Sequence, residues 1–204
     1  MPYLCAGWEN SGNIELYYDD LGEGRPVVLI HGWPLSAASW EKQVPVLLDA
    51  GYRVIAYDRR GFGRSSQPSS GYTYDTFAED LNKLLTSLDI TDATLVGFSM
   101  GGGEVARYLA IYGSRRVSQA AFISAIPPFL LRTEDNPTGV DGEVFEGIRR
   151  GIVNDRPAFL AKFFRDFYNT DILKDRLIST DAVQLSWITG ARASPIATLD
   201  SVTA

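Results

Sequence analysis

A serine set between two glycines is the feature of this sequence best suited to chemistry. The run reads Gly97-Phe98-Ser99-Met100-Gly101. It follows an apolar stretch at 93–96 and leads into good helix formers at 102–110. Glycines fit so tight a strand-to-helix corner because they carry no Cβ. The pattern predicts a nucleophile elbow, which holds Ser99 at a helix N-terminus whose unpaired N–H groups favour an oxyanion. Such a site suits acyl transfer, whereas the structural alternative is an ordinary turn.

A second polar segment follows another apolar run, at 26–30, and it reads His31-Gly32-Trp33-Pro34. We expect the backbone N–H of Trp33 to complete an oxyanion hole with that of Met100. His31 is the only histidine of the chain. Because it precedes a glycine at the end of a strand, we favour a role in bracing loops over a role as catalytic base, for which it would have to reach the serine hydroxyl.

The other motifs that could bind a cofactor are incomplete. Residues 58–66 hold arginines and glycines, but Ser66 stands where a dinucleotide fingerprint needs its third glycine, so we interpret them as a bracing loop. Gly101 to Gly103 are not followed by the lysine of a phosphate loop. One histidine and one cysteine cannot form a nitrogen and sulfur metal site. We therefore expect neither a cofactor nor a metal.

Composition narrows the class of protein. The 204 residues are 45% hydrophobic and carry a formal net charge of −6, which suits one globular domain and argues against nucleic acid as a partner. Cys5 is the only cysteine, so no internal disulfide can form. No apolar run is long enough to cross a bilayer, and the first residues lack a basic lead. We expect a cytoplasmic protein without membrane association.

The elements expected to position these residues alternate along the first two thirds of the chain. Strands are expected at 3–8, 13–18, 26–30, 52–57, 93–96 and 119–124, and helices at 37–50, 74–88 and 102–110. This order predicts an α/β fold with a mainly parallel sheet and helices on both faces. In such sheets ligands bind at the carboxyl ends of the strands, where His31, Asp58 and Ser99 fall.

The character of the sequence changes after residue 126. We divide the chain into an α/β core at 1–126 and a helical cap region at 127–204, because amphipathic, aromatic-rich segments replace the strands. A Pro-, Asp- and Gly-rich link at 133–142 is expected to lead into the cap.

Three motifs together resemble a known family. They are His31 to Pro34, the run from Tyr57 to Pro68, and Gly97 to Gly102. In order and spacing they resemble the α/β-hydrolase fold, and within it the cofactor-free haloperoxidase, aryl-esterase and perhydrolase group. The resemblance implies hydrolysis of small carboxylic esters through an acyl-Ser99 intermediate, without haem or metal. It also implies perhydrolysis, in which hydrogen peroxide replaces water, and it associates Pro34 with that reaction. Gly32, Gly97, Phe98 and Gly101 would support the site.

The resemblance also implies an acid and a base after the cap, and no histidine follows His31. We therefore expect an N-terminal portion of such an enzyme that lacks the last strands and is nearly inactive alone. A separate C-terminal fragment or a second copy of the chain would complete it. The alternative is a non-catalytic protein that holds a small ligand or a partner in the same cleft.

Overall fold

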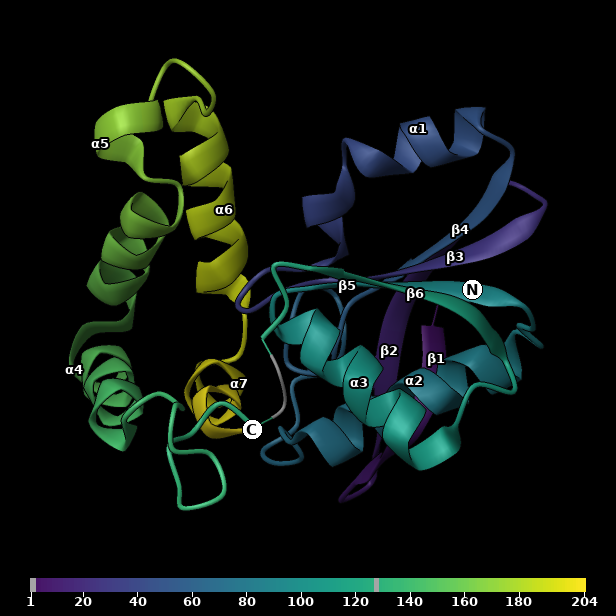
Figure 1. The fold of residues 1–204 in the computed structure, drawn as a ribbon, viewed down its shortest axis with the longest axis horizontal. Helices are drawn as coiled ribbons and strands as arrows, with labels where there is room; N and C mark the ends of the chain where they lie inside the picture. Colours follow the sequence, from purple (N-terminus) through teal and green to yellow (C-terminus); the bar gives the residue numbers. More distant parts are fainter. Residues whose placement is uncertain (1–2, 127–128) are drawn as a thin grey trace.

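A six-stranded sheet forms the centre of the molecule in a computed structural model that describes residues 3–126 and 129–204 (Figure 1). The strands are β1 (Tyr3–Glu9), β2 (Gly12–Leu21), β3 (Arg25–Ile30), β4 (Tyr52–Tyr57), β5 (Ala93–Phe98) and β6 (Val117–Ile123). Their spatial order is β1-β2-β4-β3-β5-β6. The first two strands form an antiparallel hairpin and β2 runs antiparallel to β4, whereas the pairs among β3, β4, β5 and β6 are parallel. The predicted mainly parallel sheet is confirmed.

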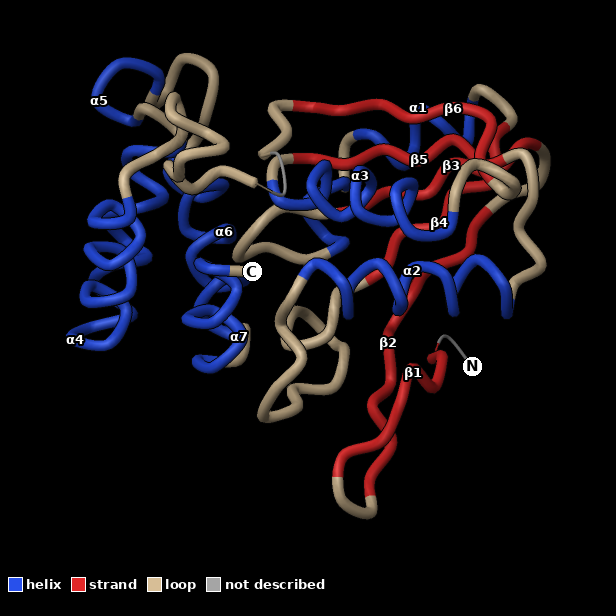
Figure 2. Tube along the Cα trace, turned by 60° about the horizontal axis from the view of Figure 1, so that its bottom comes forward, coloured by secondary structure: helices blue, strands red, loops and turns tan. Residues whose placement is uncertain are grey.

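Helices cover both faces of this sheet, as predicted. The helices α2 (Tyr74–Ser87) and α3 (Met100–Tyr112) lie on one face, and α1 (Gln43–Asp49) lies on the other (Figures 1 and 2). Successive residues of a strand point to opposite faces, so Val28 and Ile30 pack with α2 and α3 while Val27 and Leu29 pack with Trp40. The second half of β3 is thus buried on both faces, whereas β5 is buried on one face and half-buried on the other.

One predicted helix is wrong in its extent. The single helix expected at 37–50 is instead a short 3₁₀ helix, η1 (Ala37–Trp40), followed after a break by α1. Pro45 accounts for the break, because a continuous helix would place its missing N–H in the interior, where the N–H of each residue is needed. In α1 the proline lies in the first turn, where its lack of an N–H does no harm.

Residues 129–204 contain helices and two isolated bridges, and no strand in that described stretch. The helices are α4 (Gly142–Phe167), α5 (Thr170–Leu173), α6 (Thr180–Arg192), α7 (Pro195–Asp200) and the 3₁₀ helix η2 (Ser201–Thr203). Helix α4 is broken at Asp155 (φ −159°, ψ 87°), two residues before Pro157. The predicted link at 133–142 precedes α4. The proposed boundary between core and cap falls beside Pro127 and Pro128, which lie outside the described residues.

Candidate active site

Ser99 lies at a strained corner between β5 and α3. Its backbone has φ 54° and ψ −121°, a region that non-glycine residues seldom occupy. Three hydrogen bonds hold this conformation: the Ser99 N–H donates to the Ile123 carbonyl at 3.0 Å, and the Ser99 carbonyl accepts from Gly102 at 2.9 Å and Ile126 at 3.0 Å. These hydrogen bonds therefore hold Ser99 in a strained backbone conformation at the N-terminus of α3.

The flanking glycines are required by close backbone contact. A Cβ on Gly97 would lie 2.5 Å from the Gly101 carbonyl oxygen. A Cβ on Gly101 would collide with the Ile30 carbonyl oxygen and lie 2.9 Å from that of His31. Real Cβ atoms do not approach backbone so closely, so larger residues would push α3 away from β3. The corner is tight for the steric reason that the sequence pattern indicated.

The loop after β3 lies against Ser99. A Cβ on Gly32 would be 3.1 Å from the Ser99 Cβ and 2.9 Å from the Phe98 ring. The Trp33–Pro34 peptide bond is cis, and the Trp33 indole donates to the Thr198 carbonyl at 3.1 Å. Met100 is the first residue of α3, where an N–H has no partner within the helix. Met100 directly follows Ser99 and Trp33 directly follows Gly32, which packs against Ser99; the role of both as oxyanion donors stays a prediction.

His31 is fully buried and both of its ring nitrogens contact backbone. The Arg59 N–H donates to Nε2 at 3.0 Å, which makes Nε2 an acceptor, and Nδ1 lies 2.9 Å from the Gly32 carbonyl oxygen. Burial, and then the charge of Arg59, lower the pKa of His31 well below its ordinary value. A neutral ring bonded in this way braces the loop, and this geometry favours the structural interpretation over a base for Ser99.

A buried ion pair that the motifs did not reveal joins this loop to α3. Arg59 Nε donates to Glu104 Oε2 at 2.7 Å, and Arg59 Nη2 donates to the His31 carbonyl at 3.0 Å. Tyr57 donates to the other oxygen of Glu104, and both charged side chains are at most 1% exposed. The sequence held one indication that Glu104 is buried. It lies four residues before Tyr108 on a helix, so the two side chains share the face that packs against the sheet.

The segment at 58–66 is the brace that its composition indicated. Asp58 accepts from the backbone N–H groups of Ala37 and Arg64, each at 2.7 Å. Arg60 forms a buried bidentate pair with Asp80 at 2.6 and 2.7 Å. These contacts tie the loops at the carboxyl ends of β3 and β4 to α2 and η1. They therefore fix the position of the loops around the site.

An aromatic wall from the helical region faces the same loops. The Trp33 ring lies 5.1 Å from that of Phe163, and the Phe98 ring lies 6.3 Å from that of Phe167. A cavity of about 380 Å³ opens beside this wall, and it is lined by Ile148, Phe159, Lys162, Phe163, Asp166 and Phe167. Its size falls within the roughly 300–1,000 Å³ of small-molecule sites. Two residues of its lining, Phe163 and Phe167, thus contact Trp33 and Phe98, and Phe98 directly precedes Ser99.

Two further observations concern the residues that the structure describes. No group of three histidine, cysteine, aspartate or glutamate side chains among them is arranged to hold a metal ion. None of the helices in the described part of the chain is long and apolar enough to cross a membrane.

The fold and the elbow together define a class of protein. The family profile described as alpha/beta hydrolase fold matches residues 25–192, and the chain belongs to this family. As the motifs indicated, its relatives are hydrolase-type enzymes of the non-haem haloperoxidase and esterase group.

Three relatives give the comparison its detail. A putative non-heme chloroperoxidase of a Synechocystis strain is 61% identical over 99% of this chain and 73% of its own length. The crystal structure of a bromoperoxidase from Bacillus anthracis superposes with a TM-score of 0.93 at 52% identity, over 99% of this chain and 72% of that one. The bifunctional esterase/perhydrolase DCH of Acinetobacter calcoaceticus is 41% identical over 72% of this chain and 54% of its own length. The chain therefore spans about half to three quarters of these relatives.

Proposed function

We propose that the chain carries the nucleophile and oxyanion hole of a serine esterase and perhydrolase that acts on small carboxylic esters or acids. The strained backbone of Ser99 at the N-terminus of α3 carries this proposal. The mostly apolar cavity lined by Phe163 and Phe167, whose rings contact Trp33 and Phe98, supports a small apolar acyl or aryl group as the part of the substrate that it holds.

The reaction has two steps. The Ser99 hydroxyl attacks the acyl carbon and loses its proton to a base, and the C–O bond to the alcohol breaks as the alcohol takes up a proton. The N–H groups of Trp33 and Met100 stabilise the oxyanion formed on the way. Water then releases the acid from acyl-Ser99, or hydrogen peroxide releases the peracid, and Ser99 regains its proton.

The base is the part of the reaction that these residues do not provide. The one histidine is His31, and its ring nitrogens already contact the backbone of Gly32 and Arg59. Removing a member of a catalytic triad costs several orders of magnitude in rate and leaves only the residual acceleration of the oxyanion hole and binding. We therefore infer that turnover by these 204 residues alone is close to that residual rate.

A completing partner has a place to bind at the sheet. Among the described residues, β6 pairs with β5 on one side only, and its side chains Phe122 and Ile123 are 51% and 43% exposed. An open strand edge with apolar side chains is a template for another strand. We propose that a fragment that supplies the acid and the base, rather than a second copy of the chain, pairs with this edge.

Hydrolysis of p-nitrophenyl acetate tests the proposal. We expect slow release of p-nitrophenol by the 204-residue protein and a rise of at least about a hundredfold when a polypeptide matching the remaining C-terminal part of the Synechocystis relative is added. In Ser99→Ala the added polypeptide should give no such rise, and the rate should stay at the residual level. A gain of the same size in Ser99→Ala, or no gain from a fragment that is shown to bind, would contradict the proposal.

A further inference from the structure

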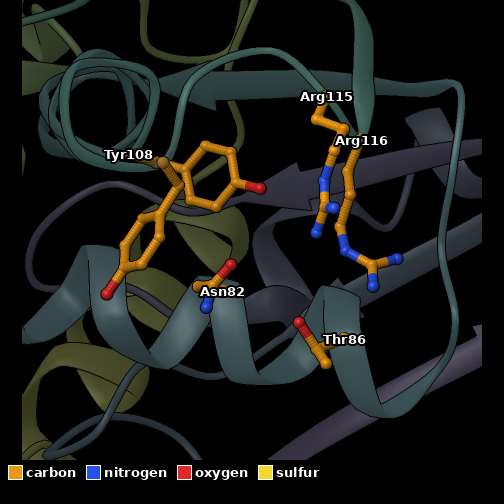
Figure 3. Close-up of a pocket in the computed structure, with 6 residues that line it drawn as sticks. Asn82, Thr86, Tyr108, Arg115 and Arg116 are labelled. Carbon is orange, nitrogen blue, oxygen red and sulfur yellow. The ribbon is translucent and has the colours of Figure 1, made fainter.

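A second cavity lies far from Ser99, at the other end of α3. It has a volume of about 220 Å³ and is lined by Asn82, Thr86, Tyr108, Tyr112, Arg115 and Arg116. The 13 residues of α3 span about 20 Å, so the length of that helix separates the cavity from the elbow. Figure 3 shows the side chains of Arg115 and Arg116 extending toward α2, from which Asn82 and Thr86 face them.

The groups that line this cavity are mostly hydrogen-bond donors. Arg116 uses one N–H to bind the Ile90 carbonyl at 2.7 Å and lies 3.6 Å from the exposed carboxylate of Asp89, which leaves it further donors. Arg115 has no hydrogen bond or ion pair with any residue that the structure describes. Two guanidinium groups against one exposed carboxylate make this a local positive site on a chain of net charge −6.

Tyr108 gives a second and independent indication. It is only 1% exposed, yet its hydroxyl makes no hydrogen bond within the described parts of the chain. Tyr108 lines the cavity, so its hydroxyl is open to a ligand that accepts a hydrogen bond from it. Burial raises the pKa of Tyr108, and the positive charges of Arg116 and Arg115 oppose that rise. The phenol is thus a protonated donor at neutral pH, and both guanidinium charges act on it.

We propose that this cavity is a binding site for a small tetrahedral oxyanion of the phosphate type. Arg115 and Arg116 supply the charge, and Tyr108, Asn82 and Thr86 can supply neutral donors. The volume is below the roughly 300 Å³ at which drug-sized sites begin, which favours a single small group. The site is independent of the reaction proposed at Ser99.

The structural alternative is that Arg115 and Arg116 only stabilise the fold. Helix α2 ends at Ser87 and α3 at Tyr112, and cations near helix C-termini offset the negative ends of those helices. That role requires no ligand, so it predicts no saturable binding.

An NMR titration of the 204-residue protein with sodium phosphate, at fixed pH and ionic strength, separates the two. We expect saturable shifts of the backbone amides at 82–86 and 108–116. Arg115→Gln should weaken the affinity at least about tenfold, because it removes a charged donor, and Tyr108→Phe several-fold. Ser99→Ala should bind as the unchanged protein does.

The matched control is Arg150→Gln, which removes the same charge from an exposed pair with Glu143 on α4 and should leave the affinity unchanged. Shifts that rise linearly without saturation would overturn the proposal. So would equal weakening by Arg115→Gln and Arg150→Gln, or saturation by acetate with none by phosphate.

Discussion

The elbow region and the helical region are built in different ways. The elbow region, which comprises residues 30–34, 57–60 and 97–104, is held by backbone contacts and a buried ion pair between Arg59 and Glu104. The helical region, residues 129–204, packs instead through aromatic and aliphatic side chains, with Leu160 and Phe164 at its centre. Its ion pairs, such as that between Lys162 and Asp166, are exposed.

This contrast fits the tasks of the two regions. A nucleophile and its oxyanion donors must keep fixed positions, and backbone contacts without room for a Cβ allow little displacement. A wall of aromatic rings has fewer directional constraints, so substitutions there change the shape of the cavity at smaller cost. The comparison predicts that similar changes have unequal effects in the two regions.

The largest difference is expected for removal of a charge. Glu104→Gln leaves Arg59 buried without its carboxylate and should lower the free energy of unfolding by about 3–5 kcal/mol. The matched change in the helical region, Asp166→Asn, breaks an exposed pair and should have no measurable effect. Urea unfolding followed by circular dichroism measures both. Equal losses would show that the buried pair is not a special feature of the elbow region.

A smaller difference is expected for the addition of one methyl group. Gly101→Ala would force its Cβ against the carbonyls of Ile30 and His31 and should destabilise the protein by about 2–3 kcal/mol. Gly147→Ala places a Cβ within α4 at an ordinary contact distance of 4.0 Å from Arg150 Nη2 and should stabilise by up to about 1 kcal/mol. Thermal unfolding of the two variants should therefore shift in opposite directions. A Gly101→Ala protein as stable as the parent would show that α3 can move away from β3 at little cost.

The smallest effect is a pH dependence of stability due to His31. Burial lowers its folded-state pKa well below 6.5, so below pH 6.5 the unfolded chain binds a proton that the folded chain does not. Stability should thus be undiminished above pH 6.5 and fall on acidification, with a slope that approaches about 1.4 kcal/mol per pH unit. His31 is the only histidine, so the part of the slope between pH 7.5 and 5.5 that is lost in His31→Gln is due to it. A slope that survives in the variant would assign it to another group.

Much of the elbow region could be predicted from the sequence because its causes are local. Ser99 lies between two glycines after a buried strand. The lack of Cβ atoms on these glycines is what allows the tight strand-to-helix corner, and it can be inferred from the sequence alone. The pairing of Arg59 with Glu104 could not be predicted in this way, because its partners lie 45 residues apart and meet only once β3, β4 and β5 are in place.

The sequence predicted that residues 129–204 are helical, but not how these helices are broken and packed. Amphipathic spacing indicated helices, whereas the break of α4 at Asp155 and the contact of Trp33 with Thr198 depend on tertiary packing. The helix expected at 37–50 was wrong because spacing of apolar residues was given more weight than Pro45. The roles of Trp33 and Met100 as oxyanion donors stay predictions that geometry supports.

Labelling with a fluorophosphonate tests the central claim most directly, namely that Ser99 is positioned as a nucleophile. After prolonged incubation with excess reagent, peptide mass spectrometry should find one adduct, on Ser99, and none in Ser99→Ala. The elbow and the oxyanion donors retain part of the catalytic power when the base is absent, so slow labelling is expected. No adduct on Ser99, which is the result expected of a non-catalytic binding protein, would contradict the account.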